Sequence, residues 1–220
     1  MCNIALIATS HKENGMCNIK ELLKILQTIK PDVIFEELSQ QLFTDIYSGR
    51  LSDSLETNTI KIYSNEKIVK HLPVDVDGNQ LIDREVKDSI SNMFEIFNRN
   101  HDYQDLILQL RKYSYESGFP YLNSIQCETL LAKKYFFEQR LAEGYKQGNL
   151  VSVHQTWIRI NEFRERQMLA NIYKYSELNN FDNAIFLVGA EHRKPIIDLT
   201  NQNEIEKEAS INWNFRYFVN

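Results

Sequence analysis

The chain has 220 residues, of which 43% are hydrophobic and 25% are charged, as expected for one globular domain with a buried core. Its formal net charge of −5 at pH 7 argues against nucleic acid as the main partner, because phosphate binding requires a basic surface. The three cysteines form no CxxC motif and suit a reducing compartment, and no apolar run is long enough for a membrane span. The first predicted strand begins almost at Met1, which leaves no room for a signal peptide. We therefore expect a cytoplasmic protein with no membrane partner.

The N-terminal residues predict a unit of strand, helix and strand. An apolar run at residues 3–8 is the first strand. A helix is expected at residues 18–29, because apolar residues recur there at helical spacing behind Asn18, a typical N-cap. Residues 33–37 form the next strand. This order of elements is the building block of a parallel sheet.

Both strands end in side chains that can carry chemistry. The first is followed by Ala8-Thr-Ser-His11, and the second closes with Glu36 and Glu37. Alternation along a strand sends the two glutamates to opposite faces, so at most one of them points at a given site. We expect the second strand to neighbour the first, which would bring a glutamate near His11. A solvated acidic loop is the alternative interpretation.

The following stretch is less regular. Residues 38–47 are expected to be helical, whereas residues 58–69 fit either a strand or a helix. Residues 72–78 predict a short strand that leads into a turn. Asp77 in this turn and Arg84 beyond it could line the edge of the sheet, although an exposed turn and helix start is the simpler interpretation.

Residues 81–178 are helical in pattern almost throughout and divide into four predicted helices. This is too long for one crossover between parallel strands, so we interpret residues 81–180 as a helical bundle inserted above the carboxyl edge of the sheet. The fourth helix carries Arg164 and Asn171 on an inward-facing stripe. A solvated face rich in Arg and Glu is the alternative for that helix.

Near the C-terminus the pattern of the first strand returns. Residues 184–188 are an unbroken apolar run, typical of a buried strand, and Gly189, Glu191 and His192 follow it. Pro195 indicates the start of another helix. If the two strands are parallel and close together, both imidazoles lie at one edge, where open α/β sheets bind ligands. Two unrelated histidines, each capping its own helix, are the alternative.

Residues 210–219 alternate between apolar and polar side chains and predict a half-buried strand at the sheet edge. The predicted fold class is therefore α/β, with a mainly parallel central sheet, flanking helices and a large helical insertion. We expect a single domain over residues 1–220, with a sheet core at about 1–80 and 181–220 and the insertion at about 81–180.

Four motifs occur in an order that resembles the Tiki/TraB and ChaN/erythromycin-esterase-like superfamily. They are Ala8-Thr-Ser-His11, Pro31-Asp-Val-Ile-Phe-Glu-Glu37-Leu38, Arg164-Glu165-x-x-Met168-x-x-Asn171 and Gly189-Ala-Glu-His192. The chain departs from the family pattern at Ala8, where the family has Gly, and at Glu165, where it has Asp.

The resemblance implies a hydrolase that acts on a peptide or ester bond of a peptide or small-molecule substrate. Tiki-like members are metal-dependent proteases, esterase-like members hydrolyse a macrolide ester by general-base catalysis, and ChaN-like members are associated with haem. A divalent ion (Mn, Co or Zn) is thus a possible cofactor, with haem as the alternative. A non-enzymatic haem or ligand-binding module, or a toxin or immunity-type interaction domain, are the alternative functions.

The residue types suit either form of hydrolysis. Imidazoles and carboxylates can hold a divalent ion and leave positions for water. Without a metal, His11 can act as general base with Glu37 orienting its ring, and Arg164 can stabilise developing negative charge. The expected catalytic residues are His11, Glu37, Arg164 and His192. The expected metal ligands are His11, Glu36, Glu37, Glu191 and His192. The expected supporting residues are Glu13, Asp77, Arg84, Glu165 and Asn171.

Overall fold

The structure, a computed structural model, describes residues 2–77, 81–145, 149–202 and 211–218. A five-stranded parallel sheet forms its centre, in the order β3-β2-β4-β1-β5. The strands are β1 (Cys2–Thr9), β2 (Val33–Glu36), β3 (Lys70–Pro73), β4 (Asn183–Gly189) and β5 (Ile211–Asn214). The predicted α/β class with a parallel sheet is confirmed.

Strand β4 pairs with β1, as expected, but it also separates β1 from β2, which were expected to be neighbours. The two histidine-bearing strands are neighbours, since β1 and β4 pair in parallel with Thr9 opposite Gly189. However, β2 does not lie next to β1 as expected, because β4 fills the place between them and pairs with both. The first crossover therefore skips one position in the sheet, and a strand from the end of the chain occupies it.

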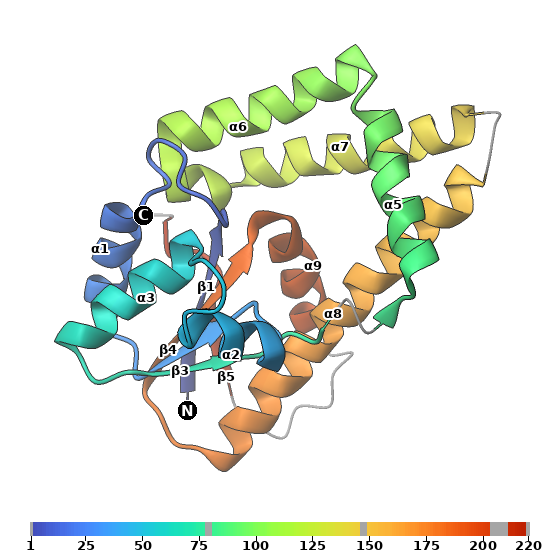
Figure 1. Ribbon diagram of the computed structural model, residues 1–220. Coiled ribbons are helices and arrows are strands. Elements are labelled where there is room, and N and C mark those ends of the chain that lie inside the picture. The colour runs from blue at the N-terminus through green and yellow to red at the C-terminus, as the bar shows by residue number, and fades with distance from the viewer. Residues whose placement is uncertain (1, 78–80, 146–148, 203–210, 219–220) are drawn as a thin grey trace.

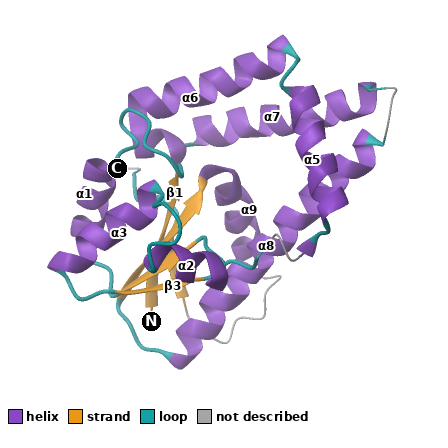
Figure 2. Cartoon of the chain, viewed as in Figure 1, coloured by secondary structure: helices purple, strands orange, loops and turns teal. Residues whose placement is uncertain are grey.

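Helices cover both faces of the sheet (Figure 2). One face packs against α1 (Ile19–Ile29) and α3 (Leu55–Glu66), and the other against α8 (Leu150–Leu178) and α9 (Ala190–Asn201). The short α2 (Gln40–Tyr47) follows β2. The stretch that fitted either a strand or a helix is thus helical: Ser54 caps α3, and Ile60 and Tyr63 are buried in the core.

The inserted helices form a second core of their own. They are α5 (Arg84–Phe97), α6 (His101–Leu122), α7 (Ile125–Gly144) and the first half of α8. In Figure 1, α6 and α7 lie beyond the carboxyl ends of β1 and β4, and α5 crosses from α7 to α8. No described helix combines the length and the apolar character that crossing a membrane would require.

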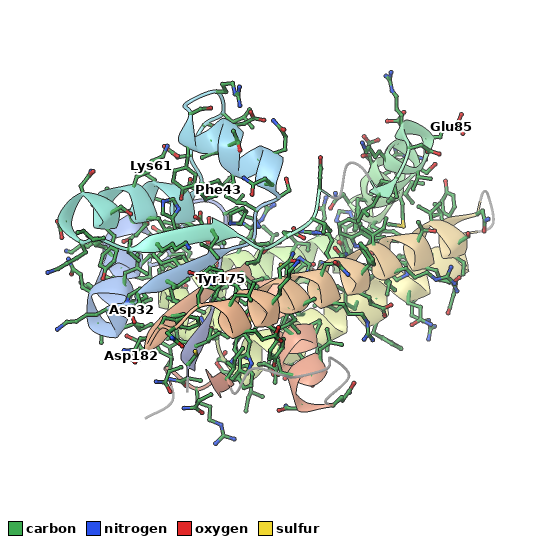
Figure 3. All side chains as sticks on the ribbon, turned by 90° about the horizontal axis from the view of Figure 1, so that it is seen from below. Asp32, Phe43, Lys61, Glu85, Tyr175 and Asp182 are labelled. Atoms are coloured by element: carbon green, nitrogen blue, oxygen red, sulfur yellow. The ribbon has the colours of Figure 1, made fainter. Side chains whose placement is uncertain are left out.

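The long α8 joins the insertion to the sheet, because its first half belongs to the core of the inserted helices and its second half to the sheet core. Met168 and Ile172 in its second half pack in the sheet core against Phe35 and Phe186. Figure 3 shows α8 running from the sheet, near Tyr175, toward the far end of the molecule, where Glu85 lies on α5. Because these α8 side chains are closely packed in the sheet core, they hold the helix, and with it the inserted helices, in place against the sheet.

The start of α9 differs from the prediction, whereas the position of β5 at the sheet edge agrees with it. Helix α9 begins at Ala190 directly after β4, so Pro195 lies inside the helix and not at its start. A proline this close to a helix start removes only one intrahelical hydrogen bond. The strand β5 lies at the sheet edge, as predicted, but it ends at Asn214, so the predicted strand is too long at its C-terminal end; residues 210 and 219 are outside the described part, as is Gly78 of the predicted turn.

A buried asparagine ties the insertion to β1. The Ala8 N–H donates to Asn123 Oδ1 (2.8 Å) and Asn123 Nδ2 donates to the Ala8 carbonyl (3.0 Å). Since β5 pairs with β1 only as far as Ala5, the Asn123 amide supplies backbone partners beyond the end of that pairing. The side chain that ends α6 thus fixes the strand three residues before His11.

We predict that Asn123→Ala lowers the free energy of unfolding by about 2–4 kcal/mol, because it leaves a buried backbone N–H and C=O without partners. Urea denaturation followed by circular dichroism measures the change. The matched control is Asn201→Ala at the exposed end of α9, for which we expect a change within about 0.5 kcal/mol. Equal effects of the two substitutions would contradict the proposed role of the Asn123 amide.

Candidate functional site

A cavity of about 650 Å³ lies at the carboxyl edge of the sheet, within the size range of small-molecule sites. Strand ends and the loops after them form its floor, including Thr9, His11, Glu37 and Asp75. The remaining walls come from α2, the start of α3, and the inserted helices α5 and α8. The insertion thus contributes one side of the cavity, as predicted for a helical layer above this edge.

The Glu37 carboxylate is the meeting point of the site. It accepts hydrogen bonds from the Gly189 N–H (2.6 Å) and from an Arg164 Nη (2.8 Å), and its Oε1 lies 3.3 Å from His192 Nε2. Its side chain is only 7% exposed. A buried carboxylate needs such donors because burial otherwise disfavours its charge. Glu37 therefore brings the ends of β2 and β4 together with α8 and α9.

The pairs around Glu37 extend into a row of alternating charges. On one side, His192 Nδ1 donates to Glu165 Oε1 (2.6 Å). On the other, Arg164 donates to Asp75 Oδ2 through both Nε (3.0 Å) and Nη (2.6 Å), two charge-assisted hydrogen bonds. The row thus alternates carboxylate and cation in the order Glu165, His192, Glu37, Arg164 and Asp75. Each charged group in it contacts only groups of the opposite charge within the row.

This row fixes the charge of His192. Burial alone lowers the pKa of His192, but the hydrogen bonds and charges of Glu165 and Glu37 outweigh it and raise the pKa to about 10. Burial likewise raises the pKa of Glu37, but the hydrogen bond and charge of His192, with the charge of His11 and the Gly189 N–H, lower it to about 2. At neutral pH the pair is an imidazolium and a carboxylate.

The second histidine has a different environment. His11 is 62% exposed in its side chain and lines the cavity, and its Nδ1 lies 3.5 Å from Glu56 Oε1. The hydrogen bond to Glu56 is the largest effect on the pKa of His11, which it raises. Thr9 Oγ1 (2.6 Å) and Ser54 Oγ (2.7 Å) donate to Glu56 and hold its carboxylate in place. His11 is thus an accessible imidazole with a fixed carboxylate behind it.

Gly189 explains how the two histidines come so close to one carboxylate. A Cβ at this position would lie 3.2 Å from Glu37 Oε2 and 3.4 Å from His11 Nε2. Its φ of −57° is open to any residue, so the space and not the backbone conformation requires glycine. The missing side chain leaves room for both polar atoms above the end of β4.

Two of the residues expected to contact the histidines have other partners. Glu36 also lines the cavity, but its carboxylate contacts His71 Nδ1 (2.8 Å) and accepts from Tyr47 OH (2.8 Å). Glu191 pairs with Lys134 (3.1 Å) on α7, because α9 starts directly after β4 and turns this side chain toward the insertion. Neither contacts His11 or His192, so both are corrections to the predicted ligand set.

The expected supporting residues divide in the same way. Glu165 contacts His192, and Asp77 lines the cavity. Asn171 donates to the Val74 carbonyl (2.8 Å) and so holds the chain after β3 in place. Glu13 accepts from the first N–H of α1, and Arg84 is 93% exposed on α5, where it faces solvent next to Asp88. Those last two lie outside the site.

Sequence reasoning missed two carboxylates of the site. Glu56, next to His11, lies just before the stretch at residues 58–69 that fitted either a strand or a helix, so no period predicted its orientation. Asp75 follows β3 just as Glu37 follows β2, and this repeated acid after a strand end was a usable signal. The structure also pairs Glu56, and not Glu37, with His11 Nδ1.

The donor groups do not fit a divalent metal in this arrangement. Both ring nitrogens of His192 face carboxylates and its pKa is about 10, so it has no lone pair to offer at neutral pH. The Arg164 guanidinium already occupies the Glu37 oxygen that a cation would take. Across the described ranges, no group of three or more His, Cys, Asp or Glu side chains has an arrangement that could hold a metal ion.

We predict a pH-dependent loss of stability in His192→Gln. A histidine with a raised folded pKa stabilises the fold fully below its unfolded pKa of 6.5, and this contribution is lost as the pH rises toward 10. Urea denaturation at about pH 6 should show a deficit of about 3 kcal/mol for the variant, typical of a broken buried ion pair. At about pH 9 the deficit should be smaller. A deficit that does not change with pH would contradict the imidazolium assignment, and the exposed His101→Gln is the control.

Comparison with known proteins adds no assignment to this geometry. No protein-family model matches the chain, and the search of curated proteins and of solved structures finds no match. The cavity and the charged row at its floor are therefore the basis on which the function is inferred.

Proposed function

We propose that the protein is a hydrolase that cleaves an ester or peptide bond by general-base catalysis, with His11 as the base. One observation carries the proposal: two imidazoles at the ends of neighbouring parallel strands have opposite roles fixed by their surroundings. His192 is buried between two carboxylates and cationic, whereas His11 is accessible from the cavity and has a single carboxylate at Nδ1. Pairs of titratable groups held in different charge states are typical of acid–base catalysis.

His11 has the orientation that a base requires. With Nδ1–H directed to Glu56, the unprotonated nitrogen is Nε2, which borders the space above Gly189. In the proposed reaction, Nε2 takes a proton from water while the water oxygen bonds to the substrate carbonyl carbon. When the tetrahedral intermediate collapses, the bond to the leaving group breaks and the proton passes from His11 to that group.

The cations of the floor support the developing negative charge. Arg164 lines the cavity, and His192 lies directly behind Glu37. Their position is fixed by Glu165, Glu37 and Asp75 before any substrate binds, and charges fixed in advance cost little reorganisation during the reaction. We infer that these two residues stabilise the oxyanion electrostatically, while Glu37 holds them at the correct distance.

The motif resemblance to the Tiki/TraB and ChaN/erythromycin-esterase-like superfamily belongs to the same proposal. It favours the metal-independent, esterase-like form, because the donor set around His192 does not suit a metal ion. The proposed interaction domain without activity would have Arg164 or Glu37 turned away from both histidines, and the Glu37 contacts argue against it. A ligand-binding module is the second candidate, favoured by the size of the cavity.

We predict that His11→Ala lowers ester hydrolysis by about 100- to 10,000-fold in kcat/KM, the usual contribution of a general base. The assay uses a panel of p-nitrophenyl esters, with His101→Ala as the control because His101 is an exposed histidine at the start of α6. Unchanged turnover in His11→Ala would rule out the base. Activity lost to a chelator and restored by Mn, Co or Zn would point to the metal-dependent form, and a His11-dependent Soret band after haem titration to the binding module.

We predict that Glu56→Gln moves the acidic limb of the pH profile to lower pH. The Glu56 carboxylate raises the pKa of His11, so its loss lowers that pKa and leaves His11 unprotonated, and active as a base, at lower pH. The measurement is kcat/KM as a function of pH, which reports the free enzyme. If the acidic limb stays in place or moves to higher pH, Glu56 does not raise the pKa of the catalytic base.

A further inference from the structure

The cavity wall opposite the strand ends is mainly apolar. It is formed by the start of α5 and the middle of α8, and its large side chains are Ile82, Ile90, Trp157 and Ile160. Trp157 packs edge-on against Phe94, at 5.5 Å between ring centroids, which holds its indole in the wall. This apolar surface belongs to the core of the inserted helices but borders the cavity, so a ligand that reaches it must present apolar groups.

A lysine interrupts this apolar wall. Lys87, Ile90 and Ser91 are three and four residues apart on α5, share one face of the helix, and all line the cavity. Lys87 is half-buried. Within the ranges that the structure describes, no carboxylate lies at ion-pair distance from its ammonium group. The cation thus faces a space that contains no fixed counter-ion for it.

The acidic groups of the floor are, by contrast, already engaged. Glu37 and Asp75 bind Arg164, and Glu56 binds Thr9 and Ser54. Glu36 contacts His71 and Tyr47 through its two oxygens. Because these carboxylates have their own donors, the floor does not provide a partner for Lys87. Lys87 is therefore free to form an ion pair with an anionic group that enters the cavity and replaces its water.

We propose that the substrate is an amphipathic carboxylate: an apolar chain with the scissile bond at one end, at His11, and a carboxylate at the other, at Lys87. This inference rests on the proposed function for the scissile end only. The single positive charge of one ammonium group matches the single negative charge of a carboxylate. Ser91, one turn along from Lys87, can donate a second hydrogen bond to the same group.

The experiment measures binding without turnover. The probes are unbranched amides of increasing chain length that end in a carboxylate, a methyl group or an ammonium group. Calorimetric titration into His11→Ala, and into this variant with Lys87→Met added, gives the affinities. We expect the carboxylate probe to bind tightest and Lys87→Met to weaken it about tenfold, as for one charge-assisted contact, with the methyl probe unaffected.

The controls separate this inference from the proposed function. Arg84→Gln removes a cation from the same helix outside the cavity and should leave the carboxylate affinity unchanged. Lys87→Arg should retain most of it. In the protein with His11 present, Lys87→Met should raise KM for the carboxylate-ended p-nitrophenyl ester and leave kcat unchanged.

Each outcome bears on one proposal. An affinity for the carboxylate probe that Lys87→Met leaves unchanged, while the protein with His11 still hydrolyses esters, would overturn the substrate inference and leave the hydrolase proposal intact. If binding of the carboxylate probe depends on Lys87 but no ester is hydrolysed, the hydrolase proposal fails and the inferred carboxylate site stands. Tightest binding of the ammonium probe, or of a phosphonate-ended probe, would contradict the carboxylate assignment.

Discussion

The Glu37 carboxylate is the constraint on which the site depends. An isolated buried carboxylate is unstable, so Glu37 persists only because Gly189, Arg164 and His192 meet its oxygens. Those three partners come from β4, α8 and α9, and Glu37 itself from the end of β2. One desolvated charge thus specifies how four elements approach one another.

The order of the strands makes this meeting possible. Because β4 lies between β1 and β2, its carboxyl end brings Gly189 and His192 between His11 on one side and Glu37 on the other. With β2 beside β1, the two histidines would have been separated by a strand. The skipped position in the first crossover is therefore what places a cationic imidazole and an accessible one around a single carboxylate.

The sequence predicted those parts of this arrangement that depend on local patterns. Apolar runs, caps and helical spacing are short-range signals, and they located β1, β2, β4 and the helical insertion. The parallel pairing of the His11 and His192 strands followed from their shared pattern. The place of β2 did not, because a skipped position in a sheet depends on contacts between distant segments and leaves no local trace.

The side-chain partners were predictable to a smaller extent. Strand alternation correctly separated Glu36 from Glu37, whereas Glu191 was misplaced because Pro195 suggested a later helix start. Glu191 was expected in a turn before the helix but lies in the first turn of α9, where the helical backbone directs it toward Lys134 on α7. Glu56 was missed because no element was predicted over it: it precedes residues 58–69, whose period was itself undecided, and without a period the direction of a side chain is open.

The late strand also has a consequence for how the protein is made. During synthesis β1 and β2 emerge early, but the strand that joins them emerges only after the whole helical insertion. Until β4 has emerged, the edges of β1 and β2 that will pair with it carry unpaired backbone N–H and C=O groups, and other chains can pair with these edges. The insertion, which has its own core, can form in that interval. The groups around Glu37 therefore assemble only after β4 and α9 have emerged, and a chain truncated before β4 would have neither the central strand of the sheet nor a complete site.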